Sequence, residues 1–107
     1  MESKRQPRVL LVEDDIHLAD IYRKRFEMGG FKIRVVSAGD QTFDEVDRNR
    51  PQVILLDILM PKMDGFTVLE RLKSQTKTQD IPVILLTNIG QKQDIDRGFE
   101  LGAEDYI

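Results

Sequence analysis

Residues 53–66, VILLDILMPKMDGF, decide the fold of this 107-residue chain. They join an apolar run, Val53–Leu56, to a turn and then to a segment that starts at Asp64-Gly65 with apolar residues at a spacing of three. Those apolar residues are Phe66, Leu69 and Leu72. A short, continuous apolar run suits a strand that is covered on both faces, as in a parallel sheet. The stretch therefore predicts a buried strand, a turn and a helix.

The same alternation extends along the chain in both directions. Four-residue apolar runs predict strands over 9–12, 33–36, 53–56 and 83–86, and a fifth strand begins at 106–107. Helical patterns lie between them, over 16–28, 41–49, from 64–65 onward and over 92–101. The first helix has Asp15 as a plausible N-cap, glycines at 29–30 as its stop, and an expected apolar stripe of Ile16, Ala19, Ile21, Tyr22 and Phe26. Alternating strands and helices predict right-handed crossovers and a doubly wound α/β fold with a parallel sheet.

Size and composition fit one soluble domain over residues 1–107. Zero cysteines exclude disulfides and thiolate chemistry, and the single histidine, His17, cannot build a histidine-rich metal site. The net charge of −3 argues weakly against a nucleic-acid-binding surface. No apolar run nears the roughly 20 residues that a membrane helix needs, and no signal-type stretch follows the opening MESKRQP. We therefore expect a cytoplasmic domain without membrane contact.

Polar side chains follow three of the predicted strands. Glu13, Asp14 and Asp15 end the first strand, Asp57 ends the third, and Thr87 ends the fourth. In open parallel sheets, ligands sit outside the carboxyl ends of the strands. Like charges gathered there repel each other, so the cluster predicts a bound cation. Asp15 by itself is better explained as a helix cap, because it directly precedes a helix.

The residue types at this edge point to magnesium and to phosphoryl chemistry. Oxygen ligands without histidine or cysteine suit a hard ion, and Mg²⁺ typically takes one or two carboxylates, several waters and phosphate oxygens. A carboxylate beside that ion, such as Asp57, can attack phosphorus and form an acyl phosphate. The Thr87 hydroxyl is placed to donate a hydrogen bond to the new phosphoryl oxygens.

Four segments resemble the receiver domains of two-component response regulators. They are LLVEDD at 10–15, VILLDILMPKMDGF at 53–66, IPVILLT at 81–87 and GAEDY at 102–106. The resemblance covers nearly the whole chain after its first seven residues, and the middle motif in this order is highly specific. It implies a flavodoxin-like, chemotaxis-regulator-like sheet with strand order 2-1-3-4-5. In this chain the last strand would be cut short and the fifth helix would be missing, so that the receiver domain is incomplete at its C-terminal end.

The resemblance also implies a role for individual residues. Asp57 would accept a phosphoryl group from the phosphohistidine of a sensor histidine kinase or phosphotransfer protein. Glu13 and Asp14 would hold Mg²⁺, or Mn²⁺ in its place, together with the Asp57 carboxylate and the backbone carbonyl of Leu59.

Two further residues would carry the switch. By the same resemblance, Thr87 would bond the phosphoryl group and Tyr106 would be the aromatic switch that turns inward as Thr87 moves. The alternative for Tyr106 is a half-buried aromatic residue at the start of a strand.

The sequence departs from the family pattern at its end. The family has a lysine two residues beyond Ile107, and the resemblance implies that its absence impairs phosphorylation or signal transmission. A missing fifth helix would leave apolar surface on one face of the sheet, which predicts a homodimer, a domain swap or low stability.

The residues around the acceptor predict a long-lived phosphoryl group. Asn88 stands where the family usually has a small residue, and would narrow access to Asp57. Leu59 and Ile89, each two residues beyond a key position, are apolar and cannot orient an attacking water by hydrogen bonding.

Three alternatives compete with a phosphoacceptor. An aspartate-nucleophile phosphatase needs a second carboxylate at Leu59, and a nucleotide-binding module needs a glycine-rich motif after the first strand, which is absent. We therefore expect no enzyme acting on an external substrate. A pseudo-receiver that serves as a protein-interaction scaffold is the serious competitor, and the intact acidic set argues against it.

The stretch 94–106, DIDRGFELGAEDY, resembles receivers that precede winged-helix DNA-binding domains. It implies a dimerisation face made of Asp94, Arg97, Glu100, Glu104 and Asp105. An ordinary solvated helix face explains these residues equally well. DNA contact is expected only through a domain that this chain lacks.

Overall fold

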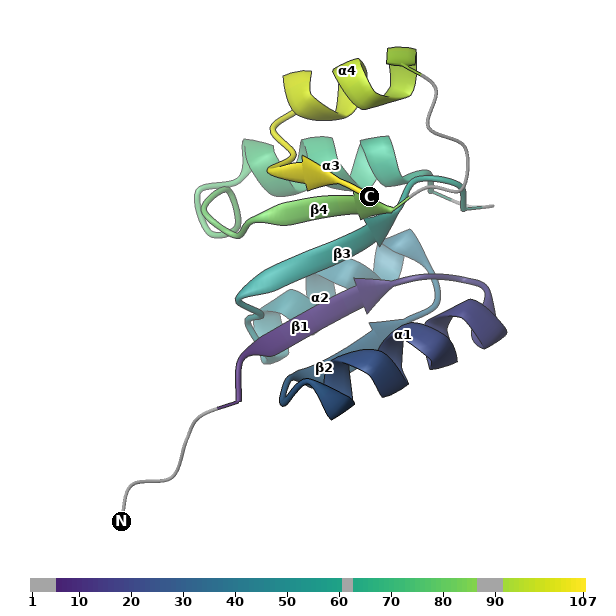
Figure 1. Cartoon of the computed structure of the whole chain (residues 1–107). Coiled ribbons are helices and arrows are strands. Elements are labelled where there is room, and N and C mark those ends of the chain that lie inside the picture. Colours follow the sequence, from purple (N-terminus) through teal and green to yellow (C-terminus); the bar gives the residue numbers. More distant parts are fainter. Residues whose placement is uncertain (1–5, 61–62, 87–91) are drawn as a thin grey trace.

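The computed structural model describes residues 6–60, 63–86 and 92–107 of the chain, and in these ranges five parallel strands form one sheet (Figure 1). The strands are β1 Arg8–Val12, β2 Lys32–Val36, β3 Val53–Asp57, β4 Val83–Leu86 and β5 Asp105–Tyr106. Their order in the sheet is β2-β1-β3-β4-β5, and each neighbouring pair is parallel. The predicted doubly wound α/β fold and its strand order are confirmed, including a short last strand.

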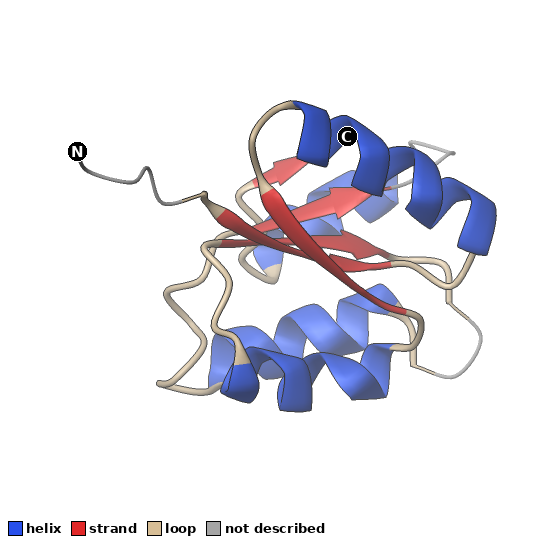
Figure 2. Cartoon of the chain, turned by 90° about the horizontal axis from the view of Figure 1, so that it is seen from below, coloured by secondary structure: helices blue, strands red, loops and turns tan. Residues whose placement is uncertain are grey.

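Helices connect the strands and lie on both faces of the sheet (Figure 2). They are α1 Ile16–Met28, the short 3₁₀ helix η1 Gly39–Gln41, α2 Thr42–Arg48, α3 Gly65–Ser74 and α4 Lys92–Glu100. Asp15 caps α1, because its Oδ1 accepts the backbone N–H groups of His17 and Leu18 at 2.9 and 3.1 Å. Gly30 ends that helix with a φ of +89°, a conformation that favours glycine. Each predicted helix is present, with bounds within about one residue of those expected.

The sheet separates two apolar cores, because successive strand residues point to opposite faces. The core beneath α2 and α3 contains, among others, Leu10, Leu56, Leu69, Leu72 and Leu85. The second core packs alternate strand residues against α1, with Leu11, Leu55, Ala19, Tyr22 and Phe26 among its members. The strands are therefore covered on both faces, as their continuous apolar runs predict. None of the helices in the described ranges is long and apolar enough to cross a membrane.

The apolar stripe predicted for α1 is partly wrong. Ile16 is 78% exposed and Ile21 is 52% exposed, whereas Ala19 is buried. Ile21 lies about 160° around the helix from Ala19, on the side away from the sheet. Ile16 is the first residue of the helix and lines an open hollow with Val35 instead of packing in the core. Spacing alone did not show where α1 crosses the sheet.

The apolar surface expected on one face of the sheet is present but limited. Val53 and Ile84 are half-buried beside the α1 core, Leu55 between them is only 3% exposed, and Ile107 is 65% exposed. The homodimer or domain swap predicted from this surface remains a prediction.

Candidate functional site

The carboxyl end of β1 places two acidic side chains at the edge of the sheet. Glu13 directly follows β1, and its backbone N–H donates to the carbonyl of Val36 in β2 at 3.1 Å. Its carboxylate is nearly enclosed, with 3% of the residue exposed. The Glu13 Oε2 atom accepts the backbone N–H of Asp15 at 3.1 Å, so the turn into α1 holds this carboxylate in place. Asp14 continues the same turn.

The carboxyl end of β3 carries Asp57, which is half-buried. Its Oδ1 atom accepts the backbone N–H of Leu59 at 3.1 Å, while the Leu59 side chain is 61% exposed. Gly65 lets α3 begin directly against this turn. A Cβ atom at Gly65 would lie 2.5 Å from both the Asp57 carbonyl oxygen and the Ile58 Cα atom. Only glycine allows this close approach, so Gly65 helps to set the backbone that presents Asp57.

These two strand ends bring together the acidic residues that the sequence predicted. Carboxylate oxygens of Glu13, Asp14 and Asp57 all lie within 4.8 Å of one another. They border an open hollow of about 210 Å³, which is lined by Glu13, Asp14, Asp15, Leu18, Tyr22, Asp57, Leu59 and Leu86. Among the described residues, no lysine or arginine forms an ion pair with these three carboxylates. Within the part of the chain that the structure describes, the cluster is therefore a concentration of negative charge that no ion pair balances.

This crowding changes the acidity of the cluster. Burial raises the pKa of Glu13 to about 8, against the opposing effect of the Asp15 N–H, and the hydrogen bond and charge of Asp57 raise it further. Burial also raises the pKa of Asp57, although the Leu59 N–H and the hydrogen bond with Glu13 act in the opposite direction. Both shifts favour a protonated Glu13 whose carboxyl group donates a hydrogen bond to the Asp57 carboxylate. A bound cation would replace that proton and keep both groups ionised.

The donor set fits a hard divalent cation. All the side-chain donors are carboxylate oxygens from Glu13, Asp14 and Asp57, which is the chemistry that Mg²⁺ and Mn²⁺ prefer. The wide hollow leaves room for waters or phosphate oxygens to complete the coordination. Leu59, whose carbonyl the resemblance implied as a ligand, is also at this site. The contact that the structure gives is its N–H to Asp57, which sequence reasoning missed because it depends on the turn geometry.

The two predicted switch residues have different outcomes. Thr87 lies outside the described residues. Tyr106 is half-buried on β5, its ring packs beside the core under α3, and its side chain lies close to Gly98 of α4. The Tyr106 hydroxyl is buried and has no hydrogen-bond partner among the residues that the structure describes. Its side chain therefore points inward, and its role as a switch remains a prediction.

The predicted dimerisation face is mostly open. Four of its residues are exposed and Asp94 is half-buried. The Arg97 guanidinium lies 4.4 Å from the ring centroid of Phe66, which links α4 to α3. That contact was not predicted, because it joins residues from two helices. Asn88 and Ile89 lie outside the described ranges.

The family model described as response regulator receiver domain matches residues 9–107. The DNA-binding dual master transcriptional regulator RpaA of Synechocystis is 40% identical over 101 residues, which cover 94% of this chain and 42% of that protein. The chain thus spans less than half the length of the curated relatives that it matches.

Solved structures show the same architecture. A putative response regulator from Chloroflexus aurantiacus superposes with a TM-score of 0.91 at 28% identity, covering 96% of this chain and 84% of that one. The Mn²⁺-bound form of response regulator Rcp1 superposes with a TM-score of 0.86 at 25% identity, covering 94% of this chain and 79% of that one.

Proposed function

The chain belongs to the response regulator receiver domain family, and we propose that it is a phosphorylation switch in which Asp57 accepts the phosphoryl group. The observation that carries the proposal is the convergence of Glu13, Asp14 and Asp57 within 4.8 Å at the carboxyl edge of the sheet. One of the similar solved structures, that of response regulator Rcp1, is a Mn²⁺-bound form, which supports a divalent cation at a site of this kind.

In the proposed reaction, an Asp57 carboxylate oxygen attacks the phosphorus of a phosphohistidine on a sensor histidine kinase or phosphotransfer protein. The new P–O bond forms as the P–N bond breaks, and the departing imidazole retains the electron pair and takes up a proton. The Leu59 N–H orients the Asp57 carboxylate through Oδ1 and leaves its second oxygen for attack. Thr87, which follows β4 in the sequence, would donate a hydrogen bond to the transferred group.

The acidic partners of Asp57 would bind the metal. Glu13 and Asp14 would hold Mg²⁺ with Asp57 and the Leu59 carbonyl, and the ion would supply positive charge to offset that of the transferring group. The Asp15 N–H holds Glu13 in position for this role. Glu13 must lose its proton to serve as a ligand, because a neutral carboxyl group is a poor donor.

Intact mass after incubation with acetyl phosphate or phosphoramidate and Mg²⁺ tests the proposal. We expect one phosphate adduct on the parent chain, and none on the Asp57→Asn variant or without Mg²⁺. Asp80→Asn is the matched control, because Asp80 is an exposed aspartate outside the acidic cluster. An adduct that persists in Asp57→Asn would contradict the assignment of the acceptor. Loss of the adduct in both aspartate variants would show that the effect is not specific to Asp57.

The chain is not proposed to turn over an external substrate. An aspartate phosphatase would need an acidic residue two positions after its nucleophile, and Leu59 stands there. With Leu59 and Ile89 unable to bind a water by side-chain hydrogen bonds, the phosphoryl group should persist. Loss of the adduct within minutes in the presence of Mg²⁺ would contradict this.

We propose that phosphorylation changes contacts with a partner or a second copy of the domain, on the surface that includes Arg97 and Glu100. RpaA is named a DNA-binding regulator, and this chain matches 42% of its length. Any DNA contact of a protein that carries this domain would then lie outside the matched region. The exchange with a kinase is expected to take place in the cytoplasm.

A further inference from the structure

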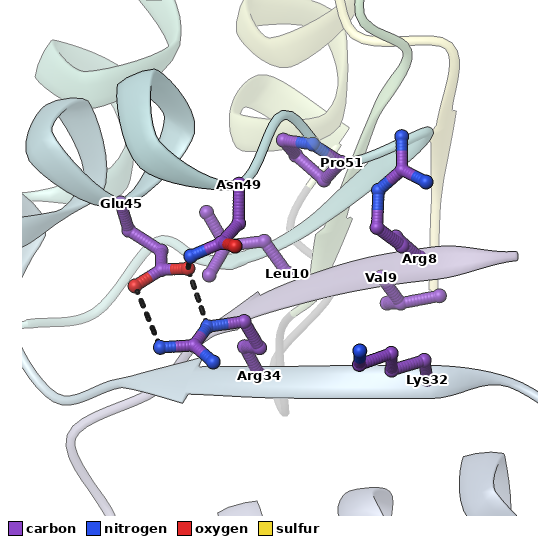
Figure 3. A pocket seen from close by; sticks show the side chains of 8 residues that line it. All are labelled: Arg8, Val9, Leu10, Lys32, Arg34, Glu45, Asn49 and Pro51. Atoms are coloured by element: carbon purple, nitrogen blue, oxygen red, sulfur yellow. Dashed lines mark hydrogen bonds and ion pairs between the residues drawn. The ribbon is translucent and has the colours of Figure 1, made fainter.

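A second hollow lies at the opposite end of the sheet from Asp57, where the strands begin. It is bordered by the first residues of β1 and β2 and by the end of α2, and its lining consists of Arg8, Val9, Leu10, Lys32, Arg34, Glu45, Asn49 and Pro51 (Figure 3). Because β1 rises about 3.3 Å per residue, Arg8 lies about 13 Å from the end of β1 that leads to the acidic cluster. The two hollows are therefore separate.

Positive charge gathers in this hollow because of strand register. Arg8 of β1 pairs with Lys32 of β2, and Leu10 pairs with Arg34, so the three basic side chains share one face of two neighbouring strands. Figure 3 shows Lys32 and Arg34 on the same side of β2, with Glu45 and Asn49 facing Arg34. Neighbouring strands lie about 4.8 Å apart, so Arg8 and Lys32 repel each other.

Among the described residues that line the hollow, Glu45 is the one carboxylate, and it is already neutralised. Glu45, 8% exposed, accepts a hydrogen bond from Arg34 Nε to Oε2 at 2.5 Å and one from Asn49 Nδ2 at 3.0 Å. Neither Arg8 nor Lys32 forms an ion pair with any residue in the described ranges. Arg8 Nε donates to the carbonyl oxygen of Arg50 at 2.9 Å, which positions the guanidinium, and a neutral carbonyl group does not cancel its charge.

The shape of the hollow limits what can balance these charges. Val9, Leu10 and Pro51 are buried and form an apolar wall on one side, whereas Arg8 and Lys32 remain exposed to water. The hollow has a volume of about 50 Å³, enough for about four water-sized groups at roughly 10–15 Å³ each. A planar oxyanion such as acetate has four heavy atoms and a tetrahedral one such as phosphate has five, so either is close to this size, and Arg8 offers the donors that suit it.

We propose that this hollow binds a small oxyanion, a carboxylate or phosphate group, between the Arg8 guanidinium and the Lys32 ammonium. The anion relieves the repulsion between these two register neighbours and accepts their hydrogen bonds. The Arg34–Glu45–Asn49 contacts form one wall and take no direct part in neutralising the ligand. This site is independent of Asp57 and of its phosphorylation.

Amide chemical shifts in ¹⁵N spectra test the proposal. They are recorded on the Asp57→Asn variant without Mg²⁺, so that shifts caused by anion binding in the hollow are not confused with effects at the acidic cluster. Sodium phosphate and sodium acetate are titrated separately at constant ionic strength, with sodium chloride as the balancing salt. We expect saturable shifts centred on Val9, Leu10 and the amide of Lys32, with a dissociation constant on the order of millimolar for two largely solvated cations.

Charge-removing variants then identify the ligands. Arg8→Gln and Lys32→Gln should each weaken binding about fivefold, while Lys24→Gln, which removes an exposed charge on α1 with 70% side-chain exposure, should leave it unchanged. Saturation by phosphate alone would assign a tetrahedral anion, and saturation by both probes would extend the site to carboxylates. Shifts that do not saturate up to about 100 mM anion, or that respond equally to all three variants, would overturn the proposal.

Discussion

Each end of the sheet brings side chains of like charge close together, but the two clusters differ in how deeply they are buried. At the carboxyl end, Glu13, Asp14 and Asp57 bring three negative charges within 4.8 Å. At the amino end, Arg8 and Lys32 are register neighbours with the same positive charge. The first cluster includes a carboxylate that is 3% exposed, whereas both basic residues are largely exposed.

The comparison indicates that burial sets the strength of the repulsion within a cluster of like charges, and with it how tightly the cluster should bind a counter-ion. Repulsion between like charges is several times larger in a low-dielectric site than at a water-exposed surface. The acidic cluster therefore retains a proton in the absence of a cation, as the raised pKa of Glu13 indicates. The basic pair stays charged and is stabilised by water, so its ligand should bind weakly.

Gly65→Ala should have the largest effect, because it disturbs the backbone that supports the acidic end. The added Cβ would lie 2.5 Å from two backbone positions, the Asp57 carbonyl oxygen and the Ile58 Cα atom, and backbone cannot move aside cheaply. We expect a loss of about 3 kcal/mol in the free energy of unfolding, measured by urea denaturation. Phosphorylation by acetyl phosphate should slow as well, because the shift reaches Asp57.

Gly29→Ala is the matched control for that substitution. A Cβ at Gly29 would meet its nearest atoms at 3.5 Å, and the residue has a φ of −83°, which alanine adopts easily. Its effect should stay within about 0.5 kcal/mol. Equal stability of the two alanine variants would show that the close approach at Gly65 does not constrain the site.

The pH dependence of stability should reveal the proton on Glu13. The folded pKa of about 8 lies above the ordinary value of 4.5, so the folded chain binds more protons between these values than the unfolded chain does. Stability without metal should therefore be fullest below pH 4.5 and fall as pH rises toward 8. Mg²⁺ should reverse the trend and stabilise most at pH 8, where Glu13 ionises readily.

Thermal or urea unfolding between pH 5 and pH 8 measures this effect, because the interval lies between the ordinary and the folded pKa of Glu13. Glu13→Gln should remove most of the decline, because glutamine does not titrate. Glu70→Gln, at an exposed position on α3, should leave the decline as it is in the parent chain. A parent chain whose stability rises over this interval without metal would contradict a protonated Glu13.

The acidic end could be predicted from the sequence to a greater extent than the basic end. Apolar runs located the strands, and residues that directly follow parallel strands must meet at one edge, so Glu13, Asp14 and Asp57 were placed together. Arg8 and Lys32 could not be paired in this way, because their proximity depends on the register of β1 with β2. The exposure of Ile16 and Ile21 depends on where α1 crosses the sheet, which periodicity does not show.

The raised pKa of Glu13 could also not be predicted without the structure. Its cause is the degree of burial and the short separation from Asp57, neither of which the residue types give. The hydrogen bond from the Leu59 N–H to Asp57 was likewise not predictable, because it depends on the geometry of the turn after β3. The chemistry of the site was therefore predictable, but its electrostatic state was not.

The smallest effects should come from ion pairs at the basic end, and they should differ according to burial. Arg34→Gln leaves the carboxylate of Glu45, 8% exposed, without its cation and should cost about 1 kcal/mol. Lys77→Gln breaks a pair with Asp47 at 3.5 Å in which both side chains are more than half exposed, and should cost less than about 0.5 kcal/mol. Adding salt should reduce the first cost and leave the second near zero. Equal costs for the two variants in urea denaturation would mean that burial of one partner does not govern charge pairs at this end, and the contrast between the two ends would then need another cause.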